Sequence, residues 1–227
     1  MRATWWIFGA SALALVVGAG MLGRPSLGRD GGPDVRPPRP VAAEPERGQA
    51  TGRAHATIAN PAALSGARAE EVYQAIRANL IEDYAQSGDP VAIRYIGWLR
   101  YNRFPYRSAR HGERFVNNYA NDVAQAYGRF EEVGSLPPGS IVVKDSFWVS
   151  DRGAILTGPL FLMEKMPAGF APADGDWRYM MIEADGTIAG LSGGIRAANV
   201  KFCAECHNKA PAASDHLYFM PEDARRR

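Results

Sequence analysis

The two cysteines of this chain stand three positions apart, and a histidine follows the second one directly. The segment reads Cys203-Ala204-Glu205-Cys206-His207. Two thiols at this spacing on one helical turn can add to the two vinyl groups of a single haem. The histidine that follows then lies beneath the iron as its ligand. The pattern therefore predicts one covalently attached haem c, bound through Cys203 and Cys206, with His207 as the metal ligand.

Two other uses of these side chains are favoured less. A disulfide across two intervening residues would close a small and strained ring. A zinc site would need two further ligands at suitable spacing, and the chain has no second cysteine pair. His216 would add one ligand only. Haem attachment accounts for both thiols and the adjacent imidazole at once.

The other side of the iron is predicted to be open. In the segment after the motif only His216 and Met220 could be a sixth ligand, and neither spacing is compelling. Four methionines stand before the motif, on or near predicted strands, and we interpret them as core residues that fill irregular gaps: Met163, Met166, Met180 and Met181. An iron with an open side binds or transforms small molecules, whereas a fully ligated one mainly transfers electrons.

The first 58 residues predict export followed by a tether. Residues 4–23 are almost entirely apolar and follow Arg2, as in a secretory signal peptide, and they are also long enough for an uncleaved membrane anchor. We therefore expect a periplasmic protein, soluble or tethered to the inner membrane. Residues 24–58 are rich in proline and glycine and poor in apolar side chains, which predicts a disordered tether. The folded domain is predicted over residues 59–227.

Composition narrows the class of partner. Hydrophobic residues make up 46% of the chain, which is enough for a packed core. There are 26 basic and 24 acidic residues, giving a net charge of +2. Nucleic-acid binding needs a basic surplus gathered on one face, so no nucleic-acid partner is expected.

The elements that position the motif change in type along the domain. Helical periodicity comes first and an alternation of apolar and polar residues follows, with Gly158-Pro159 interrupting one strand and Asp185-Gly186 forming a hairpin turn. The helices are expected over residues 65–87, 91–101 and 115–132, and the strands over 140–149, 155–166, 177–183 and 187–191. These elements predict an α+β fold, with N-terminal helices followed by an antiparallel β-sheet and the c-type haem motif on a C-terminal helix.

Five segments occur together in a characteristic order. They read YRSARHGERFVNNYAN (106–121), VVKDSF (142–147), GPLFLMEKM (158–166), GDWRY (175–179) and FCAECH (202–207). This set resembles the cytochrome P-460 family, which includes cytochrome c′-beta. The resemblance covers roughly residues 98–221. The haem motif alone is shared by many families, so the ordered set carries the resemblance.

The resemblance implies antiparallel β-structure around a five-coordinate haem, often in a homodimer. Proteins similar to cytochrome P-460 proper oxidise hydroxylamine with a haem cross-linked to a lysine, which Lys144 matches here. Proteins similar to cytochrome c′-beta lack this bond and bind nitric oxide or carbon monoxide. By residue type alone, Lys144 is equally compatible with an edge strand from which its amine reaches solvent.

Two functions therefore follow as expectations. The first is an exported mono-haem cytochrome that oxidises hydroxylamine or nitric oxide and passes electrons to a soluble cytochrome acceptor. The second is a non-catalytic nitric oxide- or carbon monoxide-binding protein, with a simple electron carrier as a third alternative. Whether the chain is an enzyme depends on the open side of the iron.

Hydroxylamine oxidation also needs a base, because protons leave as the electrons do. The candidates by chemistry are Asp145, Glu164, Glu131 and His111, and the sequence does not choose among them. Three aromatic side chains are candidates for lining the open side: Phe147, Trp148 and Phe161.

Overall fold

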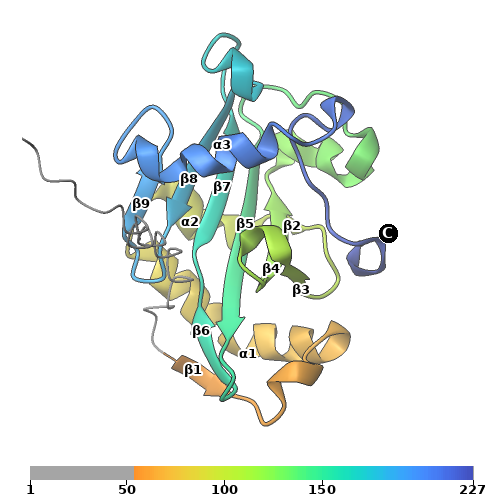
Figure 1. Cartoon of the computed structure of the whole chain (residues 1–227), viewed down its shortest axis with the longest axis vertical. Coiled ribbons are helices and arrows are strands. Elements are labelled where there is room, and N and C mark those ends of the chain that lie inside the picture. Colours follow the sequence, from red (N-terminus) through yellow and green to blue (C-terminus); the bar gives the residue numbers. More distant parts are fainter. Residues whose placement is uncertain (1–53, 227) are drawn as a thin grey trace, which may run out of the picture. The chain divides into compact units, whose positions relative to one another are not determined.

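The structure is a computed structural model that describes residues 54–226. It confirms a mixture of helices and antiparallel sheet, with few helices (Figure 1). All the strands join one sheet: β1 (Ala54–Thr57), β2 (Leu99–Arg100), β3 (Tyr106–Ser108), β4 (Arg114–Ala120), β5 (Ile141–Val149), β6 (Ala154–Thr157), β7 (Leu160–Lys165), β8 (Trp177–Ile182) and β9 (Ile188–Leu191). The strand order is β1-β6-β5-β7-β8-β9, and β4 pairs with β5 and carries β2 and β3.

The helical elements are short apart from the first. They are η1 (Pro61–Ala63), α1 (Gly66–Ala85), α2 (Pro90–Arg94), η2 (Tyr95–Gly97), η3 (Ala109–His111), η4 (Asp122–Glu132), η5 (Pro172–Asp174), η6 (Ala197–Val200), α3 (Lys201–His207), η7 (Ala212–Ser214) and η8 (Glu222–Ala224). The α1 helix runs behind the strands, whereas α3 crosses in front of β7 and β8 (Figure 1).

The α1 helix covers one face of the sheet because its apolar residues recur every three or four positions. Its buried residues are Ala69, Val72, Tyr73, Ile76, Leu80 and Tyr84. Two tyrosine hydroxyls fasten the helix to the strands. Tyr84 donates to the carbonyl of Gly158 at 2.8 Å, and Tyr73 donates to the carboxylate of Asp145 at 2.7 Å.

The opposite face of the sheet belongs to a second hydrophobic core. It combines β7 and β8 with Tyr127 of η4, Val200 before α3, and Leu217 and Met220 of the segment after α3. The two faces of β5 are therefore both covered, so this strand is buried along most of its length. The burial explains why β5 contains so many β-branched and aromatic residues.

The predicted interruption at Gly158-Pro159 is a bulge in the partner of β5. Lys144 pairs with Phe161 and Phe147 pairs with Thr157, so three steps along β5 correspond to four along its partner. The extra residue separates β6 from β7. A side chain on Gly158 would approach Ser146 Oγ to 2.4 Å, so a larger residue here would displace its neighbours.

Two of the predicted helices were wrong in part or in whole. Residues 115–132 form strand β4 and the 3₁₀ segment η4 rather than one helix. Since both faces of β4 are buried, its apolar residues do not alternate, and their spacing imitates a helix. Residues 91–101 are helical only through Gly97, after which Leu99–Arg100 pair with β4. The helices also do not all precede the strands, because β1 comes before α1 and η4 lies between β4 and β5.

The segments predicted at the start of the chain lie mostly outside the residues that the structure describes. Residues 1–23, predicted as signal peptide or anchor, and most of the predicted 24–58 tether lie outside the described residues. The end of that tether is strand β1, which pairs with β6, so the fold begins before residue 59. Within residues 54–226, no helix combines the length and apolar character needed to span a membrane.

Candidate functional site

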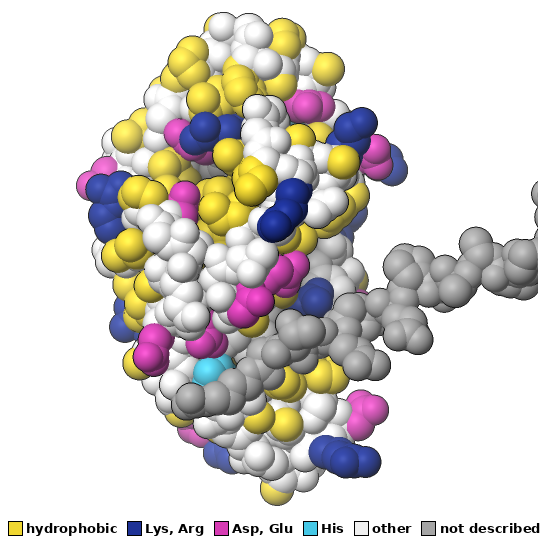
Figure 2. Space-filling model, turned by 90° about the vertical axis from the view of Figure 1, so that its left-hand side faces the viewer, with side chains coloured by type: hydrophobic (Ala, Val, Ile, Leu, Met, Phe, Trp, Pro, Cys, Tyr) yellow, Lys and Arg dark blue, Asp and Glu magenta, His cyan; other side chains and the backbone are white. Residues whose placement is uncertain are grey.

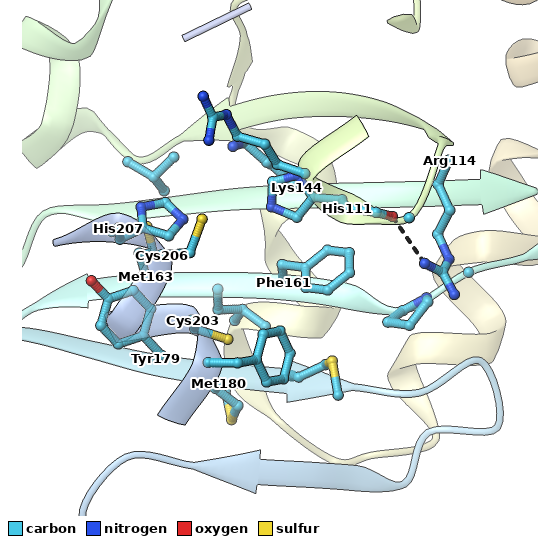
Figure 3. A pocket seen from close by; sticks show the side chains of 18 of the residues that line it. His111, Arg114, Lys144, Phe161, Met163, Tyr179, Met180, Cys203, Cys206 and His207 are labelled. Atoms are coloured by element: carbon cyan, nitrogen blue, oxygen red, sulfur yellow. Dashed lines mark hydrogen bonds between the residues drawn. The ribbon is translucent and has the colours of Figure 1, made fainter. Parts of the chain in front are cut away.

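A cavity of about 540 Å³ lies between the front face of the sheet and α3. Its volume is within the range of sites that enclose small molecules and cofactors. Cys203, Cys206 and His207 enter it from α3, and Lys144 enters it from β5 (Figure 3). The four residues predicted to act on one group therefore meet in one cavity.

The floor of the cavity consists of side chains on the same face of neighbouring strands. Strand register places them in two rows, Val142-Met163-Tyr179 and Lys144-Phe161-Met181. Apart from Lys144 and the hydroxyl of Tyr179, these side chains are apolar. The floor of the cavity is therefore largely apolar, whereas Arg110 and Arg114 add charged groups to its walls.

The two thiols are free and partly buried. Their spacing of three residues places them on the same side of α3, and both line the cavity. Burial raises the pKa of the Cys203 thiol to about 11, so this group is protonated near neutral pH. The pair is thus available for covalent chemistry with one occupant of the cavity.

His207 is buried, and one of its ring nitrogens is already committed. Nδ1 lies 2.6 Å from the carbonyl oxygen of His216, and a carbonyl can only accept, so Nδ1 carries the hydrogen. Nε2 is then left with a free lone pair. Burial, together with the charge of Lys144, lowers the pKa of His207 to about 4, which keeps the ring neutral. A neutral imidazole with this tautomer is the form that binds a metal.

The carbonyl that orients His207 is itself firmly positioned. Asp215 and His216 both adopt positive φ angles, 50° and 63°, an uncommon conformation that must be stabilised by neighbours. The Asp215 carboxylate accepts from Lys165 Nζ at 2.6 Å, and its backbone carbonyl accepts from Trp177 Nε1 at 2.8 Å. The strands β7 and β8 therefore position the segment that orients the imidazole.

Lys144 lies on a central strand, so the edge-strand alternative was wrong. The residue is 8% exposed, and its amine makes no hydrogen bond or ion pair with any residue in the range 54–226. Burial, with a further contribution from Arg110, lowers its pKa to about 8. Lys165, equally buried, is by contrast paired with Asp215. A buried amine without a partner is costly, which suggests that Lys144 serves an occupant of the cavity.

Three of the four predicted base candidates lie away from the cavity. Asp145 is fully buried on the α1 face, opposite its neighbour Lys144. Glu164 is ion-paired with Arg178, and Glu131 with Arg225. Each of these carboxylates already has a hydrogen-bonding or ion-pair partner in the fold, which explains its position without a catalytic role.

His111 does line the cavity, and so does Glu183, which the sequence interpretation missed. Burial raises the pKa of Glu183, while the nearby charge of Arg114 opposes the shift. Glu183 directly follows β8 and continues the alternation of Tyr179 and Met181, a period of two that could have revealed it.

The remaining candidates divide by the face they occupy. Of the three aromatic residues only Phe161 lines the cavity, whereas Phe147 stacks on Phe115 in the α1-side core. Met163, Met180 and Met181 line it as well. Neither candidate sixth ligand lies in the cavity lining: His216 bonds Asn208 through Nδ1, and Met220 is a core residue.

In the part of the chain that the structure describes, no group of three or more His, Cys, Asp and Glu residues is arranged to hold a metal ion. Comparison with known families finds no family model that matches the chain, and comparison with curated proteins finds no match. The resemblance to the cytochrome P-460 family therefore stays a prediction.

Proposed function

We propose that the chain is an exported mono-haem c-type cytochrome of the P-460 type that oxidises hydroxylamine or nitric oxide. Haem c would be attached through Cys203 and Cys206, with His207 Nε2 as the iron ligand. Two free thiols, an oriented neutral imidazole and a largely apolar cavity support this assignment. The α3 helix then presents the haem motif, and a single protein ligand suffices for the iron.

The observation that carries the proposal is the unpartnered amine of Lys144 in the same cavity as the thiols. A simple gas-binding pocket has no need for a buried, unpaired lysine. A covalent bond to the haem would remove the cost of burying the amine. The lowered pKa also makes the amine more nucleophilic near neutral pH, because a larger share is deprotonated.

The surrounding residues suit oxidation of a small polar molecule. Bound haem would supply a redox-active iron, and the chain supplies the environment. Phe161 and Met181 contribute apolar surface to the floor of the cavity. Glu183 lines the cavity, and burial raises the pKa of its carboxyl, so this group is placed to accept the protons that leave with the electrons. We propose a soluble cytochrome as the electron acceptor, a periplasmic location with or without a membrane anchor, and a homodimer.

The absorbance spectrum of the reduced protein tests this function. A haem cross-linked to Lys144 should give a strongly red-shifted Soret band, which returns to the ordinary c-type position in Lys144→Ala. Lys201→Ala, which removes an exposed lysine of α3, should keep the red shift. An ordinary c-type spectrum in the unmodified protein would refute hydroxylamine oxidation.

That outcome would favour the second function, a nitric oxide- or carbon monoxide-binding protein of the c′-beta type. Its supporting observation is the apolar lining, in which Phe161 faces the space beside Lys144. A low-spin, six-coordinate spectrum would instead favour an electron carrier. If Cys203→Ala and His207→Ala both retained haem content and spectra unchanged, the haem assignment itself would be wrong.

A further inference from the structure

Two of the chain's four histidines line the cavity, and only His207 has a role in the proposed site. The other, His111, comes from η3, which is distant in sequence from α3. In Figure 3 the His111 ring lies beside Phe161, away from the α3 side where His207 and the cysteines stand. An occupant attached to α3 would therefore have His111 near its far side.

Three contacts fix the position of the His111 ring. Ser108 Oγ lies 2.8 Å from Nδ1, and the ring packs against Phe161 with the centroids 4.9 Å apart. The backbone carbonyl of His111 accepts a hydrogen bond from Arg114 at 2.9 Å (dashed in Figure 3). Gly112 makes this approach feasible, because a side chain there would come within 2.4 Å of Arg114 Nη1.

Nε2 is left as the free polar atom of this ring. Since Ser108 uses Nδ1, and no residue among 54–226 forms a hydrogen bond with Nε2, only an occupant of the cavity could do so. Burial lowers the pKa of His111 to about 2, and the positive charges of Lys144, Arg114 and Arg110 act in the same direction. The ring is therefore neutral, and a hydroxyl partner at Nδ1 permits Nε2 either to donate or to accept.

We propose that His111 Nε2 hydrogen-bonds the small molecule bound in the cavity and thereby selects polar ligands over apolar ones. The inference rests on the proposed function only in that a small molecule binds at the open side of the haem. Hydroxylamine carries both donors and acceptors, so either tautomer of His111 can bind it. Carbon monoxide offers little to a hydrogen bond, so its binding should depend weakly on this residue.

His111→Phe is the principal test, because phenylalanine retains the ring that packs on Phe161 and removes both nitrogens. Absorbance titration of the oxidised protein, without an electron acceptor, gives the Kd for hydroxylamine. We expect about tenfold weaker binding, the effect of losing one hydrogen bond. The Kd of the reduced protein for carbon monoxide should change by less than about twofold. Ser108→Ala should weaken hydroxylamine binding less, and His111→Gln should restore part of it.

Glu131→Gln, which alters an exposed ion pair outside the cavity, is the control and should leave both affinities unchanged. Unchanged hydroxylamine affinity in His111→Phe would overturn the inference. Equal weakening for both ligands would also overturn it, because the ring would then act by packing alone. A change from low-spin to high-spin in His111→Phe would identify an iron ligand instead. An ordinary c-type Soret band in the unmodified protein would refute hydroxylamine oxidation but not the role of His111. The affinities for hydroxylamine and carbon monoxide can still be measured in that case.

Discussion

At the scale of single residues, the sheet contains two buried lysines in opposite circumstances. Lys165 and Lys144 are each 8% exposed. Lys165 Nζ lies 2.6 Å from Asp215 and faces the ring of Trp177 at 5.0 Å, whereas Lys144 has no such partner among the described residues. A paired buried charge stabilises its neighbours in the fold, and an unpaired one points to a ligand.

Replacing these two lysines should therefore change stability in opposite directions. Lys165→Met leaves the Asp215 carboxylate buried without its cation and should cost about 3–5 kcal/mol. Lys144→Met in the haem-free protein removes an unpaired amine and should stabilise the fold by about 1 kcal/mol or more. Urea denaturation of both variants measures the difference. Equal destabilisation by both would contradict the contrast between the two sites.

Asp145 predicts a pH dependence on the other face of the sheet. Burial raises its pKa to about 6, above the ordinary 3.8, although Asn117, Tyr73 and Tyr95 donate hydrogen bonds to it. The folded chain thus retains a proton that the unfolded chain loses between about pH 4 and 6. This contribution to stability is present below pH 4 and is lost as the pH rises through 6, by up to about 3 kcal/mol.

The measurement compares the free energy of unfolding at pH 4.5 and pH 7 in the unmodified protein and in Asp145→Asn. The variant should show a flatter dependence, and it should be less stable at pH 4.5 because an amide cannot accept from all three donors. Parallel profiles for the two proteins would show that Asp145 does not titrate in this range.

At the scale of elements, the cavity depends on the bulge between β6 and β7 and on the segment after α3, which hydrogen bonds from β7 and β8 hold in place. The bulge at Gly158-Pro159 separates β6 from β7 and forms part of the cavity wall. The segment after α3 orients His207 through the carbonyl of His216.

Strand β1 is secured by His55, whose Nε2 lies 3.0 Å from Asp83 of α1 and 2.7 Å from Thr157 of β6.

Gly158→Ala tests the bulge. The new methyl group would stand 2.4 Å from Ser146 Oγ and 3.0 Å from Arg114 Cδ, so these side chains or the strands that carry them must shift. We expect a loss of about 1–3 kcal/mol, measured by thermal or urea denaturation. Gly97→Ala is the matched control, because a side chain there meets nothing within 4 Å. Similar losses in the two variants would show that crowding at the bulge is not the cause.

At the scale of the whole molecule, the surface agrees with the balanced composition. On the side shown in Figure 2, basic and acidic side chains are interspersed, and hydrophobic side chains gather in the upper half. The largest exposed hydrophobic residue of α3 is Phe202, which borders the cavity beside Cys203.

Export and haem attachment should be coupled in the intact protein. Deleting residues 1–23 should leave the chain in the cytoplasm with free Cys203 and Cys206, because attachment is expected after export. An unrelated cleavable signal peptide in place of these residues should restore one covalent haem. Mass spectrometry of the denatured protein measures attachment. Haem bound covalently to the deleted form within the cytoplasm would contradict the prediction.

How far the sequence predicted the fold depended on the environment of each strand. The strands β5, β8 and β9 were predicted, and β6 and β7 were predicted as one interrupted strand, because β-forming residues stand between clear turns at Gly158-Pro159 and Asp185-Gly186. Strand β4 was taken for a helix because burial on both faces removes the alternation that identifies a strand. Glu183 shares the alternation of Tyr179 and Met181, but the sequence does not show that this face of β8 borders a cavity.

The sequence by itself brought Cys203, Cys206 and His207 together and predicted their shared chemistry, since three positions within five consecutive residues need no distant partner to place them. Tertiary structure alone decided what surrounds them. Strand register placed Lys144 and Phe161 in one row, and the packing of η3 and β8 added His111 and Glu183. Contacts between residues distant in sequence depend on register and burial, which no local pattern of residues encodes.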